Sequence, residues 1–254
     1  IKGVLAAPAT PYMRAHLQQR SALLAQADAV IAVSDYIRRK LLPIVPAERL
    51  HVVPNLVDLT ETEQIVAARS NLAPEQPFVL YVGKLQRNKG AHLLPEALVT
   101  ARSMRGTLPK LLIAGNGELE TELRQELTSL SIDYQILDGW IDHDEALRLM
   151  RQAEVLLFPS AWGEPLSRVL LEGLAVGACI AAINTGGTAD AIVDGVSGVL
   201  AQDAESLGRA LAALLDDGER RELLRSGARQ IARERFAPGV VAARVEAVYA
   251  SARK

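Results

Sequence analysis

Apolar residues along the chain recur in two alternating patterns between residues 78 and 201. Short runs rich in Val, Leu and Ile alternate with longer segments in which apolar residues return every three or four positions. The short runs are apolar at nearly every position, which is typical of parallel strands covered by helices on both faces. The pattern therefore predicts an α/β fold with a parallel sheet flanked by helices. The predicted strands are residues 78–82, 110–114, 134–137, 155–158, 179–183 and 198–201.

The two ends of the chain show the same alternation less regularly. Before the main run, we predict a weak strand at residues 3–7, an amphipathic helix at 13–27, a strand at 29–33 and a helix or linker at 61–72. After the last strand the pattern predicts helices at residues 206–215, 220–235 and 240–250. Residues 155–183 are the most informative stretch, with strand, loop, helix and strand in succession. Pro159 ends the first strand because it has no N–H to donate, Pro165 suits a first helical turn, and Gly177 ends the helix.

Two carboxylates, Glu164 and Glu172, bracket this predicted helix with seven residues between them. At about 1.5 Å per helical residue the pair would be roughly 12 Å apart. That separation matches the reach from the sugar to the ribose of a nucleotide-sugar, and a diphosphate would sit between them at the helix N-terminus. The alternative is that Glu164 only caps the helix and Glu172 is merely exposed.

A second candidate loop has the sequence GKLQRNKG at residues 83–90, after the strand at 78–82. Its glycines allow backbone N–H groups to approach an anion, while Lys84 and Lys89 bring positive charge. The loop is not a Walker motif, because GxxxxGK[ST] is absent. It therefore favours phosphate binding, with a basic turn of purely structural role as the alternative.

Composition and charge narrow the class of protein. The 254 residues are 49% hydrophobic and only 4% aromatic, which suits an aliphatic core in one large or two small domains. A formal net charge of −2 gives no electrostatic footprint for nucleic acid, so we predict no nucleic-acid partner. The single cysteine, Cys179, excludes an internal disulfide and is predicted to be a buried, inert thiol.

No apolar run is long enough to cross a membrane and no signal peptide is recognised, so we predict a cytoplasmic protein. The chain begins at Ile1 rather than methionine, which indicates a processed or truncated product. The basic run at residues 38–40 lies beside apolar residues. It would allow peripheral contact with the inner face of an anionic membrane, or form a solvated helix face.

Several phrases in this sequence resemble motifs of the family-four retaining glycosyltransferases, which have the GT-B fold. The resemblance extends from about residue 27 to residue 249. The departures from the family pattern are Leu56 for glycine, Lys84 for arginine, Glu118 for proline and Asp190 for glutamate. The phrases are ADAVIAVS, VVPNLVD, GKLQRNKG, GNGE, EPLSRVLLEGLAVGACIAA and GGTADAIVDG.

The resemblance implies a Rossmann-like donor-binding domain at residues 59–238. Residues 1–58 would be the remnant of an acceptor-side N-terminal domain, and residues 239–254 a helix crossing back onto it. The implied donor is a nucleoside-diphosphate sugar, which is a substrate, so no cofactor is expected. Residues with an implied catalytic role are Lys84, Lys89 and Glu164. Those with an implied role in donor binding are Gly83, Asn116, Trp140, Ile141, Leu166, Ser167, Arg168 and Glu172.

Within this set, Trp140 or Ile141 is the candidate for the nucleobase pocket, although Trp140 would equally suit a core position. The glycines of Gly115-Asn116-Gly117 and Gly186-Gly187 either contact the ligand or only form turns. In the implied mechanism, the lysines and the N–H groups near Ser167 stabilise the departing diphosphate. Glu164 would hold sugar hydroxyls and Glu172 the ribose, while the acceptor attacks from the same face.

The motif Asp142-His143-Asp144 contains the D-x-D spacing of metal-dependent glycosyltransferases of another fold. We interpret Asp142 with Glu145 as a capping box ahead of a helix instead. The four histidines show no paired-ligand spacing, so no bound metal is predicted.

The family's acceptor-side domain is expected to be mostly missing, and its usual histidine near the reacting sugar would fall near residues 6–8, where this chain has none. The chain is therefore expected to bind donor but to be inactive alone. Two alternatives stay open: a non-hydrolysing nucleotide-sugar epimerase and a non-catalytic sugar-nucleotide-binding module. The sequence does not identify the acceptor, the nucleobase or the sugar.

Overall fold

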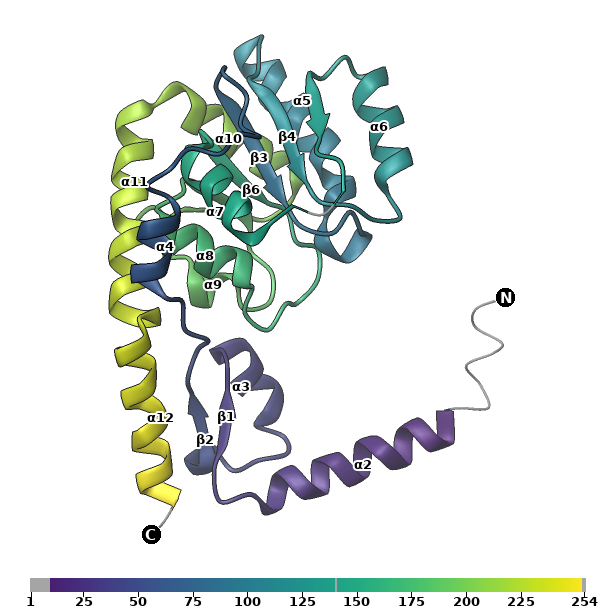
Figure 1. Ribbon diagram of the computed structural model, residues 1–254. Helices are drawn as coiled ribbons and strands as arrows, with labels where there is room; N and C mark the ends of the chain where they lie inside the picture. The colour runs from purple at the N-terminus through teal and green to yellow at the C-terminus, as the bar shows by residue number, and fades with distance from the viewer. Residues whose placement is uncertain (1–9, 140, 253–254) are drawn as a thin grey trace.

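The computed structural model describes residues 10–139 and 141–252, and the predicted strand at 3–7 and Trp140 lie outside them. Two separate parallel sheets organise the described residues (Figure 1). A six-stranded sheet has the order β5-β4-β3-β6-β7-β8, and a two-stranded sheet pairs β1 with β2. The predicted α/β class, with a Rossmann-like parallel sheet flanked by helices, is confirmed.

The apolar runs predict the strands of the larger sheet closely. β3 (Phe78–Val82), β4 (Lys110–Ala114) and β6 (Val155–Phe158) have the predicted bounds. β1 (Val30–Ala32) lies inside its predicted range, whereas β2 (Leu50–Val52) is too short for the pattern to indicate. The remaining strands are β5 (Tyr134–Ile136), β7 (Ile180–Ile183) and β8 (Val199–Ala201).

Helices follow most strands and cover both faces of the larger sheet (Figure 1). The α-helices are α2 (Thr10–Gln26), α3 (Asp35–Leu41), α4 (Leu59–Ile65), α5 (Leu94–Arg105), α6 (Glu120–Ser129), α7 (His143–Gln152), α8 (Arg168–Val176), α9 (Thr188–Ala191), α10 (Ala204–Asp216), α11 (Gly218–Ile231) and α12 (Pro238–Ala252). Short 3-10 turns are η1 (Ala47–Arg49), η2 (Arg87–Lys89) and η3 (Ala91–Leu93), and η4 (Ala232–Phe236) is a π-helical turn.

The larger sheet separates two hydrophobic cores because successive strand residues point to opposite faces. In β3, Phe78 and Leu80 belong to the core beneath α7, α8 and α11. Val79 and Tyr81 belong to the core beneath α5, α6 and α10. Cys179 is buried on this second face, where burial raises the pKa of its thiol to about 11 and keeps it protonated at neutral pH.

Helix α2 is found where a helix is predicted, but the predicted amphipathic packing is wrong. None of its residues is buried, and Tyr12, Met13, Leu17 and Leu23 are exposed. In Figure 1 the helix extends away from both sheets. Of its apolar residues, Leu24 is partly buried and packs against the small cluster of Val30, Val45 and Leu50.

The last helix, α12, runs beside the smaller sheet (Figure 1). Its Val241 and Val248 form a small buried cluster with Val53, which follows β2. The backbone N–H of Val57 also donates to the carbonyl of Phe236, at 2.9 Å, just before α12 begins. The helix thus returns to the N-terminal part of the chain, as the resemblance implies, while the domain boundaries stay a prediction.

Gly208 allows the close contact between α10 and α5. A Cβ at this position would lie 2.3 Å from the carbonyl oxygen of Ala97, inside the helix-helix interface. We expect Gly208→Ala to lower the free energy of unfolding by about 1–3 kcal/mol, because the packed backbone must move to admit the methyl group. Urea denaturation measures the change.

Gly239→Ala in α12 is the matched control, because a Cβ there meets no atom within 4 Å. The control should leave stability unchanged or raise it slightly. Equal stability of the Gly208 variant and the wild type would contradict the tight α5–α10 packing.

Candidate functional site

The candidate site lies at the carboxyl edge of the larger sheet. The chain builds outward from β3 to β4 and β5 on one side, then returns to add β6, β7 and β8 on the other. The loops after β3 and β6 therefore diverge, which opens a crevice of the kind where α/β proteins bind ligands. Residues 83–90 and 159–167, the two loops with candidate chemistry, border this crevice.

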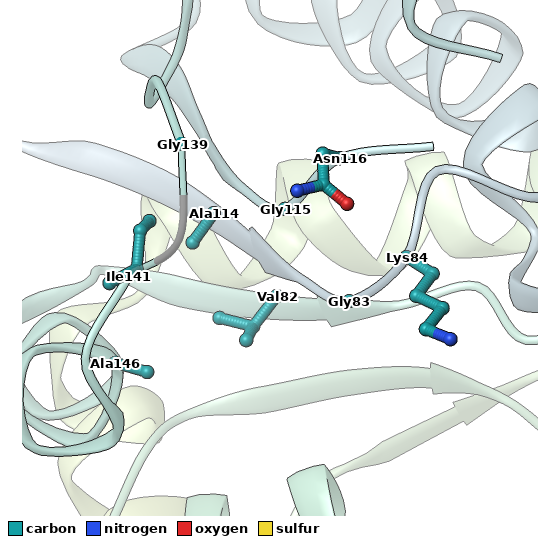
Figure 2. Close-up of a pocket in the computed structure, with 9 residues that line it drawn as sticks. All are labelled: Val82, Gly83, Lys84, Ala114, Gly115, Asn116, Gly139, Ile141 and Ala146. Atoms are coloured by element: carbon teal, nitrogen blue, oxygen red, sulfur yellow. The ribbon is translucent and has the colours of Figure 1, made fainter. Parts of the chain in front are cut away.

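A pocket with a cavity volume of about 250 Å³ lies between the loops that follow β3, β4 and β5. Figure 2 shows the apolar side chains of Val82, Ile141 and Ala146 toward one end and the polar side chains of Asn116 and Lys84 toward the other. We call it the β3–β4 pocket. An apolar end beside a few polar groups suits a flat heterocycle joined to a polar chain.

Glu164 is a buried carboxylate beside this crevice, with only 6% of its surface exposed. Its Oε1 accepts hydrogen bonds from Lys89 Nζ at 2.7 Å and from the Ser160 hydroxyl at 3.0 Å. The Lys89 ammonium also lies 5.9 Å from the centre of the Trp162 ring. A smaller cavity of about 110 Å³, here called the β6-loop pocket, is lined by Lys89, Glu164 and Ser167.

The helix that follows begins later than predicted. Ser167 is the N-cap and α8 starts at Arg168, so Pro165 is not in the first turn. Glu164 therefore does not cap the helix, and Glu172 is 8% exposed, so the alternative of a helix-capping Glu164 and a merely exposed Glu172 is wrong. The spacing estimate of a continuous helix between them is wrong, because residues 164–167 form a loop.

Two neighbouring glycines fix the loop that carries Glu164. The Gly187 N–H donates to the Glu164 carbonyl at 2.8 Å, and a Cβ on Gly187 would lie 2.0 Å from the Pro165 carbonyl oxygen. A Cβ on Gly186 would lie 2.5 Å from the Glu164 nitrogen. Of the two roles considered for these glycines, the contacts favour close packing of turns, because the Gly187 N–H is already used.

The opposite loop, which carries Lys84 and Lys89, is held against the first by Gly90. This residue has a φ of 74°, and a Cβ on it would lie 1.7 Å from the Pro159 carbonyl oxygen. Burial, followed by the nearby Glu164 carboxylate, raises the pKa of the Tyr81 hydroxyl. The hydroxyl stays protonated and donates to the Lys84 carbonyl at 2.9 Å, while the Lys84 side chain is exposed.

Glu172 is held by a histidine and an arginine on one oxygen. His143 Nε2 lies 3.1 Å and an Arg168 guanidinium nitrogen 3.2 Å from Glu172 Oε1. Sequence reasoning misses His143 as a partner of Glu172, since the residues around His143 predict only a capping box. That box is wrong: Asp142 is the N-cap but accepts no side-chain capping bond from the described residues, and Glu145 pairs with Arg148 at 2.7 Å.

The N-terminus of α8 separates the two carboxylates. Among the described residues, the Ser167 side chain makes no capping hydrogen bond to the first turn. The N–H groups at this helix start are thus left for an external acceptor, and the helix dipole adds positive potential there. Tyr36, from the part of the chain around the smaller sheet, packs against the loop that carries Glu164. A Cβ added to Gly163 of this loop would lie 2.0 Å from the Tyr36 hydroxyl oxygen.

The structure brings together most of the predicted site residues in three adjoining cavities. Leu166 is apart from them: it is 7% exposed and packs in the core while lining a different pocket. Trp140 lies outside the described residues. Those that line the β3–β4 pocket are Gly83, Lys84, Asn116 and Ile141; Gly83, Lys89, Glu164 and Ser167 line the β6-loop pocket; Arg168 and Glu172 line a third cavity beside His143.

Asp190 joins the two sheets rather than facing the crevice. Its carboxylate oxygens accept the backbone N–H groups of Asp35 at 2.9 Å and Tyr36 at 3.2 Å, at the start of α3. These residues are 155 and 154 positions away in the sequence, so local patterns could not indicate the contact. The cations of α3 are also engaged, since Asp35 pairs with Arg38 and Arg39, and Lys40 lies over the Tyr36 ring.

Two family models match the chain. Residues 63–231 match glycosyl transferases group 1, and residues 3–61 match glycosyltransferase family 4. Because the first match alone covers more than half of the 254 residues, the chain belongs to the group 1 glycosyl transferases.

Curated relatives extend beyond the region that matches this chain. Glycogen synthase of Mycobacterium tuberculosis (strain H37Rv) is 31% identical over 216 residues, covering 79% of this chain and 50% of the relative. A D-inositol 3-phosphate glycosyltransferase of Xylanimonas cellulosilytica is 32% identical over 251 residues, covering 91% and 59%. The chain thus spans only about half or somewhat more of these proteins.

The fold also matches solved structures. The crystal structure of Anabaena HepE in complex with UDP superposes with a TM-score of 0.73 and 21% identity, covering 89% of this chain and 64% of that one. At this identity the likeness shows the fold alone. Across residues 10–139 and 141–252, no helix is long and apolar enough to cross a membrane. The same residues contain no group of three or more His, Cys, Asp or Glu side chains suited to holding a metal ion.

The bonds from Asp190 predict local coupling between the sheets. We expect Asp190→Ala to speed hydrogen exchange of the first-turn amides of α3 by about tenfold or more, because bonds to a charged group contribute roughly 1.5–3 kcal/mol. Exchange followed by NMR measures this. Asp194→Ala is the control, since that carboxylate accepts only a local bond from Leu200 N–H at 2.8 Å among the described residues. Equal exchange in α3 for both variants would refute the coupling.

Proposed function

We propose that this chain carries the donor-binding part of a retaining glycosyltransferase that transfers a sugar from a nucleoside diphosphate to an acceptor. One observation carries the proposal: two buried carboxylates, Glu164 and Glu172, flank an uncapped helix start at the carboxyl edge of a parallel sheet. Family membership supports it, and the structural relative HepE was solved with UDP. A nucleotide-sugar needs contacts for its base, ribose, diphosphate and sugar, and the crevice offers a group for each.

The β3–β4 pocket is the proposed place for the nucleobase. Its apolar walls at Val82 and Ile141 would cover the faces of the ring, while Asn116 supplies a polar edge. Apolar lining with a few oriented polar groups is the usual composition of such sites. The base itself stays open between uracil, guanine and others.

The diphosphate would lie at the N-terminus of α8, facing the loop with Lys84 and Lys89. Free N–H groups of the first turn, the helix dipole and the ammonium groups all favour an anion there. Their effect grows as negative charge develops on the departing phosphate, which is the property needed to speed the transfer step. We propose that these groups replace a metal ion in this role.

Glu172 and Glu164 would hold the two sugars. Glu172 accepts bonds on Oε1 from His143 and Arg168, which orients the carboxylate toward the ribose hydroxyls. Glu164, fixed by Lys89 and Ser160, would accept hydroxyls of the transferred sugar. Lys89 is thus shared between Glu164 and the diphosphate, so its charge is available only in part to the leaving group.

The acceptor would enter from the side of the smaller sheet, where Tyr36 meets Gly163 of the Glu164 loop. Holding the acceptor near the anomeric carbon can account for roughly 7–11 kcal/mol of barrier lowering. Attack on the face from which the diphosphate leaves would retain the configuration.

Glu172→Ala tests donor binding. If this carboxylate accepts ribose hydroxyls, its loss should weaken UDP or GDP binding by at least about tenfold, since bonds to a charged group contribute roughly 1.5–3 kcal/mol. Isothermal calorimetry on the folded variant measures the affinity. Glu126→Ala is the control because Glu126 is exposed on α6, away from the crevice residues. Unchanged affinity in the Glu172 variant would remove its proposed role.

A further inference from the structure

A separate pocket lies at the junction of the two sheets. It has a cavity volume of about 270 Å³, and its lining includes Ser34, which follows β1, and Pro54, which follows β2. Arg235 of η4 and Arg244 of α12 also line it. Only Leu166 is shared between this junction pocket and the predicted donor-site residues.

The junction pocket is lined by two arginines and one carboxylate, which leaves it a net positive charge. Within residues 10–139 and 141–252, neither Arg235 nor Arg244 makes a hydrogen bond or ion pair. The neighbouring Arg233, by contrast, lies 3.3 Å from Glu63. Asp190 is the one carboxylate lining the pocket, and its oxygens are already used by the N–H groups at the start of α3.

The donors around the pocket suit an oxyanion with several acceptor oxygens. Each guanidinium presents its N–H groups as a planar fork, so two arginines offer more donors than a two-oxygen carboxylate can accept. Ser34 is 1% exposed, and its hydroxyl oxygen accepts the Ile37 N–H at 3.3 Å, which leaves the hydroxyl proton to donate. A tetrahedral phosphate can accept from all three side chains.

The remaining walls and the volume indicate what accompanies the phosphate. Val33, Val52 and Phe236 add apolar side chains to the lining of the pocket. Its volume of about 270 Å³ is near the lower end for small-molecule sites, which begin at roughly 300 Å³. We propose that the junction pocket binds a small phosphomonoester, with the phosphate on Arg235 and Arg244 and the organic group against these apolar side chains.

Titration with two probes, inorganic phosphate and phenyl phosphate, tests this on the isotope-labelled chain by NMR. The amide signals of Ser34 and Phe236 report on the junction pocket, while those of Gly83 and Asn116 report on the crevice. We expect saturable shifts at the first pair, with tighter binding of phenyl phosphate. Arg235→Gln and Arg244→Gln should each weaken this binding by about tenfold or more, because each removes a charged donor.

Arg233→Gln is the matched control, since it makes the same charge change two residues from Arg235 on the same turn. It should leave the affinity unchanged. Crevice signals at their wild-type positions, in spectra of the variants without a probe, show that the variants fold. The proposal is overturned if the probes shift only the crevice signals, or if the three variants bind alike. Equal affinity for both probes would overturn the proposal of a phosphomonoester, because the pocket would then recognise the phosphate group alone. None of these results depends on UDP binding, so this inference and the proposed function fail separately.

Discussion

The structure of the crevice depends on keeping one buried carboxylate satisfied. An ionised group removed from water is costly unless it is paired and hydrogen-bonded. Glu164 meets this requirement through Lys89 and Ser160, which come from the two loops that face each other across β3 and β6. The ion pair therefore joins those loops, and Gly90 allows their backbones to approach closely enough for it, because a Cβ there would lie 1.7 Å from the Pro159 carbonyl oxygen.

This arrangement follows from sheet order. The chain adds β4 and β5 on one side of β3, and then adds β6, β7 and β8 on the other side. The loops that follow β3 and β6 therefore leave the same edge of the sheet in different directions. The α8 helix begins inside the resulting crevice, with Glu164 before its start and Glu172 on its second turn. Two carboxylates buried there add little to stability, and the proposed nucleotide-sugar, with hydroxyls at both ends, would give each a hydrogen-bond donor.

Sequence reasoning predicted what is encoded locally. Uniformly apolar runs gave the bounds of β3, β4 and β6, because strands covered on both faces leave no polar position to blur the pattern. The pattern predicted a helix between Glu164 and Glu172, and the structure has one there, but it starts at Arg168, three residues after Pro165. The φ of proline suits a first helical turn, but here Pro165 lies in the loop before α8, and this loop packs closely against Gly186 and Gly187.

Contacts between distant parts of the chain could not be predicted in this way. His143 reaches Glu172 across 29 residues and Asp190 reaches α3 across more than 150, and neither spacing has a local signature. The capping-box pattern at Asp142 gave a wrong prediction, because Glu145 bonds to Ser70 and Arg148 instead of to the backbone at the start of its own helix. Leu166 likewise belongs to the core, since adjacent loop residues point in different directions.

A crystal structure of the chain with bound UDP would show whether the crevice holds a nucleoside diphosphate across the start of α8, as we propose. We expect phosphate oxygens at the N–H groups of the first turn of α8 and ribose hydroxyls within hydrogen-bonding distance of Glu172. UDP bound elsewhere, or bound in the crevice with its ribose away from Glu172, would contradict it.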